Sequence, residues 1–125
     1  MEMKKTKDLV EVEVDVYVAK DINVEEAIFY AKVECLCEEH KNNNENLYDG
    51  YYWTRSSKKE FTKLFSFWNE RQIRTIIKNL VEKEYIVLGK FNEDKFDNTN
   101  WYRINKKVLP NGNMFIVPKI IQEII

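Results

Sequence analysis

The strongest hydrophobic periodicity in the chain lies in residues 70–83. Asn69 can cap a helix here through its side-chain oxygen, and Gln72 completes the pattern of a capping box. The apolar positions recur at helical spacing: Ile73, Ile76, Ile77, Leu80 and Val81. The opposite side and its flanks are polar: Arg71, Gln72, Arg74, Thr75 and Lys78. The pattern predicts an amphipathic helix that starts at Glu70 and presents cations and amides to solvent.

A shorter helix and a strand pair are predicted on either side of this amphipathic helix. Ser57 and Glu60 form another capping box, which opens a short helix ending near Phe65. After the long helix, residues 85–88 and 101–105 are rich in aromatic and β-branched side chains and predict two strands joined by a polar turn. Helix, helix and hairpin in this order are the elements of a winged helix-turn-helix.

The N-terminal third predicts one strand and one long helix. Valines alternate with mainly acidic residues over residues 10–18, which is the period of a strand with one apolar face. Asn23 and Glu26 then form a capping box, and their helix is expected to run to about His40. Its inward positions are expected to be Ala27, Ile28, Ala31, Cys35 and Leu36. The polar residues 41–50 that follow predict an exposed loop.

The remaining elements complete the predicted fold class. Residues 51–55 predict a short third strand, residues 114–117 predict another strand, and Pro118 suits the first turn of a helix. We therefore expect an α+β fold, a winged helix-turn-helix with an extra N-terminal strand and a short C-terminal strand and helix. The expected divisions are a flexible N-terminus at 1–8, the winged-helix domain at 9–107 and a C-terminal extension at 108–125.

A set of short motifs across the centre of the chain resembles a known family. The motifs are YWT at 52–54, Ser57, FW at 67–68, Ile73, Leu80, YI at 85–86, Asn92, and DxTxWYxIN at 97–105. Together they resemble the N-terminal winged-helix domain of phage replisome-organiser and DnaD-like replication proteins, over residues 17–107. Proteins of that family bind DNA, usually at a replication origin, and pass it to primosome proteins. The resemblance also implies a short helix at residues 16–22, where the valine alternation predicts the end of a strand.

Three departures from the family bear on function. Glu84 stands where the family usually has glycine, at a position expected to need a left-handed backbone. Glu93 and Asp94 make the predicted wing acidic, and the C-terminal domain of many relatives is expected to be missing. The acidic wing and the missing C-terminal domain, together with the acidic N-terminal third of the chain, favour a second hypothesis. In it the fold binds a protein, as an adaptor or as a phage-encoded inhibitor such as an anti-CRISPR protein.

Composition and charge indicate a globular chain with two unlike sides. The 125 residues are 44% hydrophobic and 14% aromatic, which suits one domain with a real core. The net charge of -1 argues against indiscriminate binding of nucleic acid, but the charges are uneven. Residues 1–40 carry five basic and eleven acidic side chains, whereas residues 55–83 carry eight basic and three acidic ones. This asymmetry suggests a basic side for phosphate and an acidic side for water or protein, although charge runs are usually only solvated surface.

Double-stranded DNA is the partner that these residues indicate. The candidates for base and backbone contacts are Arg71, Gln72, Arg74, Thr75 and Lys78, because Arg reads guanine edges and Gln reads adenine in the major groove. The candidates for phosphate contacts are Lys58, Lys59, Lys90, Lys95 and Arg103. An ordinary solvated helix face is the alternative. Phe67 and Trp68 are expected to fill the core rather than to stack on bases.

Catalytic, cofactor and metal sites are not expected. The chain has one histidine and three glycines, with no nucleophile and base pair and no phosphate-cradling loop. Cys37 and His40 could supply two ligands to a metal, whereas a structural zinc site needs four, so we expect Cys35 and Cys37 to pack in or near the core. No signal peptide or membrane-spanning run is predicted, so we expect a cytoplasmic protein without a membrane partner.

The two ends of the chain carry surplus apolar side chains. We expect a homodimer built through the valine-rich residues 9–18 and the isoleucine-rich residues 118–125, because helix-turn-helix proteins commonly read paired half-sites as dimers. The alternative is that residues 118–125 fold back on their own domain. A replication protein or a host protein is a further expected partner.

Overall fold

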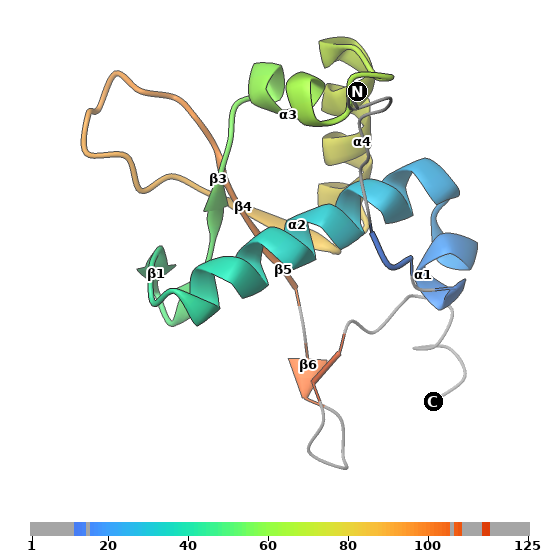
Figure 1. The fold of residues 1–125 in the computed structure, drawn as a ribbon, viewed down its shortest axis with the longest axis horizontal. Helices are drawn as coiled ribbons and strands as arrows, with labels where there is room; N and C mark the ends of the chain where they lie inside the picture. The colour runs from blue at the N-terminus through green and yellow to red at the C-terminus, as the bar shows by residue number, and fades with distance from the viewer. Residues whose placement is uncertain (1–11, 15, 106, 109–113, 116–125) are drawn as a thin grey trace, which may run out of the picture.

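Helices and short antiparallel strands make up the part of the chain that the structure, a computed structural model, describes: residues 12–14, 16–105, 107–108 and 114–115 (Figure 1). The helices are α1 (Val16–Asp21), α2 (Val24–Asn42), α3 (Lys58–Leu64) and α4 (Glu70–Glu82). The strands are β1 (Leu47–Tyr48), β2 (Tyr51–Tyr52), β3 (Thr54–Arg55), β4 (Ile86–Gly89), β5 (Trp101–Ile104), β6 (Lys107–Val108) and β7 (Met114–Phe115). This mixture of helix and antiparallel sheet is the α+β class that the sequence predicts.

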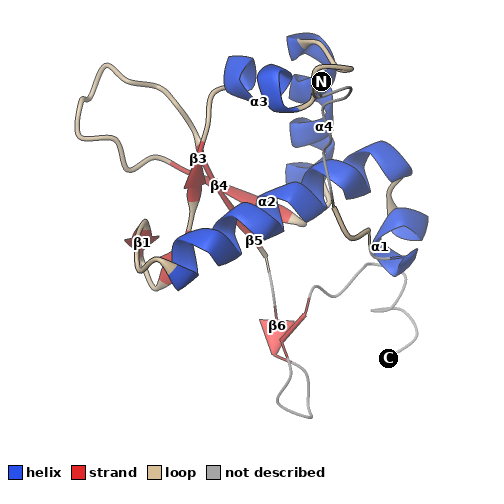
Figure 2. Cartoon of the chain, viewed as in Figure 1, coloured by secondary structure: helices blue, strands red, loops and turns tan. Residues whose placement is uncertain are grey.

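A three-stranded sheet in the order β3-β5-β4 carries the predicted hairpin. β4 pairs with β5 so that Ile86 lies opposite Ile104, and β3 pairs with β5 so that Thr54 lies opposite Tyr102. The connection from β4 to β5 is the long loop that projects from the sheet in Figure 2. Because side chains alternate across a strand, Tyr102 and Ile104 share the face that enters the main core, and Trp101 and Arg103 belong to the other face.

The main core forms where α2 crosses the sheet and meets the other helices. α2 contacts α1, α4 and strands β2, β3 and β5. In Figure 1, α3 and α4 lie together above α2, on the side from which the β4–β5 loop projects. In this core, the ring of Phe29 from α2 packs against two rings from α3 and its C-terminal end. The centroid of the Phe29 ring lies 4.7 Å from that of Phe61 and 5.9 Å from that of Phe65. Tyr85 donates a hydrogen bond from its hydroxyl to Asp21, which ties α1 to the start of β4.

Local capping signals set the ends of α3 and α4. Ser57 and Glu60 form a complete capping box, as predicted, with hydrogen bonds of 3.0 and 2.8 Å. α4 ends in the pattern of a Schellman motif, since the Tyr85 N–H reaches Leu80 O at 2.9 Å and the Glu84 N–H reaches Val81 O at 3.0 Å. Glu84 has φ 64°, so the left-handed position expected at this residue is confirmed.

The predicted N-terminal strand is wrong where the structure describes it. Residues 12–14 are in no strand, and Val16–Asp21 is the helix that the family resemblance implies. Val18 is buried in the main core, whereas Val16 is 65% exposed, so the two valines do not share one apolar strand face. Packing against α2 selects the helix over the local strand propensity of valine. Residues 9–11 lie outside the described part of the chain.

The predicted inner stripe of α2 is only partly right. Ala27 and Ala31 are buried, but Cys35 is exposed. The largest buried side chains of the helix are ones that the prediction omitted: Phe29, Tyr30 and Val33. Phe67 is another correction, because its ring is 61% exposed while the neighbouring Trp68 is buried as expected. α2 buries several sides at once, so no single stripe describes it.

A second, smaller aromatic cluster lies apart from the main core. Trp53 and Trp101 are buried but belong to no part of the main core, and they pack with Phe91 and Tyr48. The Tyr48 and Phe91 rings stack with centroids 4.6 Å apart. Gly89 passes so close to this cluster that a Cβ on it would lie 2.8 Å from Phe91 and from Trp53. Through Tyr48, the β1–β2 hairpin packs against Phe91 and against Trp101 of β5. This hairpin spans the end of the predicted loop at 41–50 and the start of the predicted strand at 51–55.

Of the predictions for the two ends of the chain, only the strand at 114–117 falls on described residues. β6 pairs with β7, so Met114–Phe115 is a strand within the predicted range 114–117. The flexible residues 1–8, the helix starting at Pro118 and the dimer contact through 118–125 all lie outside the described residues. The boundaries at 9–107 and 108–125 stay predictions.

Candidate nucleic-acid interface

α4 separates a buried apolar side from an exposed polar side. Asn69 Oδ1 accepts a hydrogen bond from the Gln72 N–H at 2.8 Å, and Gln72 Oε1 accepts one from the Asn69 N–H at 2.9 Å. The buried side consists of Ile73, Ile76, Ile77 and Leu80. The five polar residues predicted for DNA contacts are all exposed: Arg71, Gln72, Arg74, Thr75 and Lys78. The start and the orientation of this helix are therefore as predicted.

Gln72 and Thr75 already make hydrogen bonds within α4 and its N-cap. Gln72 uses its carbonyl oxygen in the capping box, and Thr75 donates its hydroxyl hydrogen to Arg71 O at 3.1 Å. A glutamine that reads adenine in two places needs both its amide N–H and its carbonyl oxygen. Because the capping box already holds the Gln72 carbonyl oxygen, Arg71 and Arg74 are the stronger candidates for base reading.

One flank of α4 faces a cationic cleft between α3 and the β4–β5 loop. Lys58 and Lys59, at the start of α3, line this cleft together with Arg74 of α4. Residues 98–100, at the end of the loop, also line it. Glu70 is the only acidic residue among the lining residues. The fold therefore brings three of the predicted cations together from segments that are separate in the sequence.

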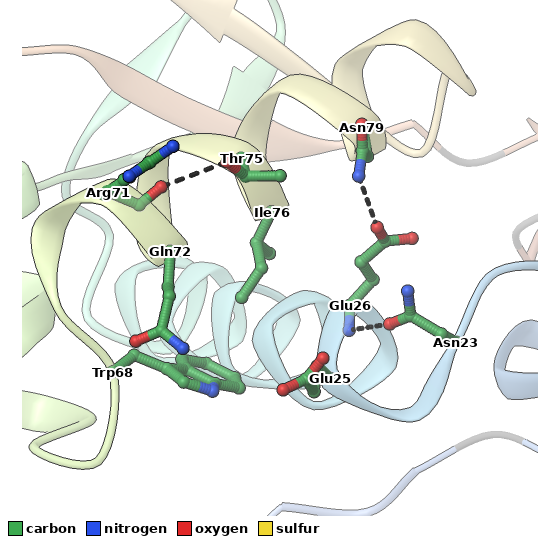
Figure 3. A pocket seen from close by; sticks show the side chains of 9 residues that line it. All are labelled: Asn23, Glu25, Glu26, Trp68, Arg71, Gln72, Thr75, Ile76 and Asn79. Carbon is green, nitrogen blue, oxygen red and sulfur yellow. Dashed lines mark hydrogen bonds between the residues drawn. The ribbon is translucent and has the colours of Figure 1, made fainter.

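The other flank of α4 faces a mixed cleft against the start of α2 (Figure 3). Arg71, Gln72 and Thr75 line it from α4, while Glu25 and Glu26 line it from α2. A carboxylate in the same cleft as Arg71, that of the exposed Glu25, disfavours a phosphate at this flank. The two sides of α4 thus differ in charge, and an anionic ligand is better accommodated on the side of Arg74.

A buried carboxylate joins α2 to α4 below this mixed cleft. Glu26 is 2% exposed, and it accepts a hydrogen bond from Asn79 Nδ2 at 2.8 Å. Its second oxygen lies 3.7 Å from Lys83 Nζ and makes no hydrogen bond. The predicted capping box at Asn23 is therefore only half formed, because Asn23 caps the Glu26 N–H while the Glu26 side chain turns to α4. Sequence reasoning missed this contact, whose one visible signal is an asparagine at position 79 beside the apolar stripe.

The loop between β4 and β5 is held by a polar network at its base. Asn92 donates to Asp97 O and Thr99 O, both at 2.8 Å, and accepts from Trp101 Nε1 at 2.8 Å. Arg55 donates to Asn92 at 3.0 Å and forms an ion pair with Asp97. Hydrogen bonds from Thr99, together with Arg55, lower the pKa of Asp97 from 3.8 to about 2. The base of the loop is therefore held by a hydrogen-bonded network in which Arg55 is paired with Asp97.

Of the five residues predicted to contact phosphate, Lys58 and Lys59 line the cationic cleft and the other three lie elsewhere. Lys90 Nζ donates to Asn98 O at 3.1 Å, and Lys95 Nζ lies 5.4 Å from the centre of the Phe96 ring, so both belong to the loop. Arg103 lies elsewhere, because its guanidinium covers the Tyr51 ring at 3.7 Å and lines a cleft shared with α2 and β2. The structure therefore does not bring Arg103 to the surface of α4.

The ion pair on the exposed side of α4 leaves its cation accessible. Lys78 Nζ lies 3.4 Å from Glu82 Oε2, with 69% and 61% of the two side chains exposed. Exposed pairs at this spacing contribute only about 0.3–0.5 kcal/mol, so a phosphate can displace Glu82 readily. Lys78 stays a candidate for backbone contact.

The described residues contain neither a metal-ion cluster nor a membrane-spanning helix. No group of three or more histidine, cysteine and carboxylate side chains lies together there in a way that could hold a metal ion. Nor does any helix in that part of the chain have the length and apolar character that crossing a membrane requires.

Comparison of the chain with known protein families, with curated proteins and with solved structures found no match.

Proposed function

We propose that this protein is a winged helix-turn-helix protein that binds double-stranded DNA in a sequence-specific manner. The observation that carries the proposal is the exposed side of α4, where Arg71, Arg74 and Lys78 project from a helix whose opposite side is buried. In this proposal α3 and α4 are the helix-turn-helix and the β4–β5 loop is the wing. Each element stands in the order that the fold requires.

The dimensions and charges of α4 suit the major groove. Thirteen helical residues extend about 20 Å, and the major groove, about 12 Å wide, admits one helix. With α4 in the groove, Arg71 and Arg74 face base edges or the nearest phosphates. Lys58 and Lys59 then flank the groove on the phosphate backbone, because they share the cationic cleft with Arg74.

The resemblance to phage replisome-organiser and DnaD-like proteins supports a more specific role. We infer that the protein acts for a phage or a mobile element, in replication initiation or in transcriptional regulation. The hairpin motif from Asp97 to Asn105 carries this inference. Three of its residues form hydrogen bonds at the base of the loop: the Asp97 carboxylate, the Thr99 backbone and the Trp101 indole.

Fluorescence polarisation with labelled duplexes from the neighbourhood of the gene tests the proposal. Wild-type protein should bind one duplex with an affinity that falls steeply with salt. Replacing Arg71 or Arg74 by alanine should weaken that duplex by about 1–3 kcal/mol and relax the preference for it. Lys58→Ala should weaken all duplexes alike and flatten the salt dependence, and Lys41→Ala, an exposed lysine of α2, serves as the control. Absence of salt-sensitive binding to any duplex would contradict the proposal.

Binding to a protein is the second candidate function, and two observations favour it. Glu25 and Glu26 line the cleft beside Arg71, and Glu93 and Asp94 are exposed in the β4–β5 loop. These carboxylates oppose close approach of DNA at two edges of the surface, whereas a protein partner could match both charges. A pull-down from nuclease-treated host lysate separates the candidates, because a partner that is retained after nuclease treatment is not bridged by DNA. Loss of that partner with Arg71→Ala would place its contact on α4.

A further inference from the structure

The cationic cleft between α3 and the β4–β5 loop is large enough for a small-molecule ligand. Its volume of about 560 Å³ lies within the range of about 300–1,000 Å³ that small-molecule sites occupy. Three segments of the chain line it: the start of α3, one side of α4 and residues 98–100 at the end of the loop. A small ligand in this cleft can therefore contact all three segments at once.

The described residues leave the three cations of this cleft without an anionic partner. In that part of the chain, the side chains of Lys58, Lys59 and Arg74 make no ion pair and no hydrogen bond. Three cations elsewhere are paired with carboxylates: Arg55, Lys78 and Lys83. Like charges that share one cleft repel one another, so an anion bound among them is attracted by every one of them.

The charge of the lining favours a ligand with several negative charges close together. Glu70 supplies one carboxylate against the three cations, which leaves a formal excess of two positive charges. Each phosphate of a DNA strand carries one negative charge, and the next phosphate is a whole nucleotide away. A di- or triphosphate chain carries several charges on directly linked phosphoryl groups. The cleft therefore matches such a chain better than it matches one phosphodiester.

The cleft also offers a neutral hydrogen-bond donor. Asn98 lines it from the end of the loop, and its backbone oxygen accepts a hydrogen bond from Lys90 at 3.1 Å. Its exposed side-chain amide makes no hydrogen bond in the described part of the chain. This amide is available to donate to a phosphoryl oxygen.

We infer that the cationic cleft is a binding site for a small ligand that carries a di- or triphosphate chain. Lys58, Lys59 and Arg74 neutralise the chain, and the Asn98 amide donates a hydrogen bond to it. Because the same cations are proposed to contact DNA, the ligand competes with DNA for the cleft. The site itself stands on the cleft alone, whereas its effect on DNA rests on the proposed function.

Calorimetric titration of the full chain with inorganic tripolyphosphate and with ATP, at constant ionic strength, tests the site. Both probes should bind saturably, and tighter binding of ATP would show that a nucleoside adds contacts to those of the phosphate chain. Arg74→Ala and Lys58→Ala should each weaken binding by about tenfold or more, because each removes a charged hydrogen-bond donor. Lys63→Ala, which removes an exposed lysine of α3 outside the cleft, is the matched control and should bind as wild type. Equal weakening by Lys63→Ala, or no saturable binding by wild type, would overturn the site.

Displacement of a labelled duplex separates this inference from the proposed function. Tripolyphosphate should displace the duplex at the concentrations that fill the cleft, and sodium sulfate at the same ionic strength should displace less. Arg71→Ala should weaken duplex binding but keep tripolyphosphate binding, because Arg71 lines the cleft on the other flank of α4. Duplex binding without saturable tripolyphosphate binding would overturn the site alone. Saturable tripolyphosphate binding without binding of any duplex would support the site and contradict the proposed function.

Discussion

α2 and α4 are the two long helices of the described chain, and they relate to their surroundings in opposite ways. α4 buries one side, including Ile73 and Leu80, and leaves Arg71 and Lys78 in solvent. α2 contacts one helix before it, α4 after it and three strands, so its buried positions surround much of the helix. α4 is strongly amphipathic, and α2 is not.

This difference distinguishes a helix that supports the core, α2, from a helix that presents one side to solvent, α4. A helix packed on one side must keep its other side polar, and that side remains open to a ligand. A helix enclosed on several sides contributes mainly to the core. In this protein α2 fixes the position of α4, and α4 carries the candidate interface. Substitutions in the two helices should therefore affect different measurements.

The largest expected effect comes from the core side of α2. Phe29 is fully buried against Phe61 and Phe65, so Phe29→Ala should reduce the free energy of unfolding by about 3–5 kcal/mol. Arg71→Ala on α4 should change it by less than about 0.5 kcal/mol, because that side chain is exposed. Urea unfolding followed by circular dichroism measures both. If both variants reduced the free energy of unfolding equally, α2 would not differ from α4 in its contribution to the core.

The buried carboxylate between the helices should give the next largest effect. Glu26→Ala leaves the Asn79 amide without its acceptor and should cost about 2 kcal/mol, and Glu26→Gln, which keeps an acceptor, should cost less. A double-mutant cycle of Glu26→Ala with Asn79→Ala should show a coupling of about 1 kcal/mol. If the two substitutions are strictly additive, this contact does not join α2 to α4.

The C-terminal end of α4 should respond in the opposite direction. Glu84 has φ 64°, which L side chains adopt at a cost, so Glu84→Gly should stabilise the protein by about 0.5–1 kcal/mol. Glu82→Gly, two residues earlier within the helix, is the matched control and should destabilise it. Thermal unfolding of the two variants gives the sign of each change, and destabilisation by both would contradict a left-handed Glu84.

The smallest expected effect belongs to the β4–β5 loop, which lies on neither helix. Hydrogen bonds from Thr99 and the nearby Arg55 lower the pKa of Asp97 to about 2. A lowered pKa stabilises the fold above the ordinary value of 3.8, and this contribution is lost as the pH falls from there through about 2. Asp97→Asn should reduce the pH dependence of stability within that window. An NMR titration that places the pKa of Asp97 near 3.8 would contradict the network.

The parts predicted correctly from the sequence are those determined by nearby residues. The caps at Ser57 and Asn69 depend on a partner three residues away, and the periodicity of α4 reflects its single packed side. The left-handed backbone at Glu84 was expected because the family that the chain resembles usually has glycine there, and it too is a local feature of a helix end. These features need no knowledge of distant contacts, so local pattern was sufficient.

The parts missed depend on distant neighbours. Residues 16–21 become a helix because they pack on α2, and Cys35 is exposed although its helical spacing suggested burial. Glu26 bonds to Asn79, which lies 53 residues away, rather than closing its own capping box. The cationic cleft likewise needs α3, α4 and the loop to converge, so the sequence indicated its cations but not their grouping. Arg103, another predicted phosphate contact, lines a different cleft.

Amide NMR shifts during titration with duplex DNA test the central claim most directly. If α4 presents the interface and α2 supports it, shifts should concentrate at Arg71, Arg74 and Lys78, at the start of α3 and in the β4–β5 loop. The exposed residues Glu38 and Glu39 of α2 should keep their shifts. Changes centred on α2, or no salt-sensitive changes at all, would contradict the account.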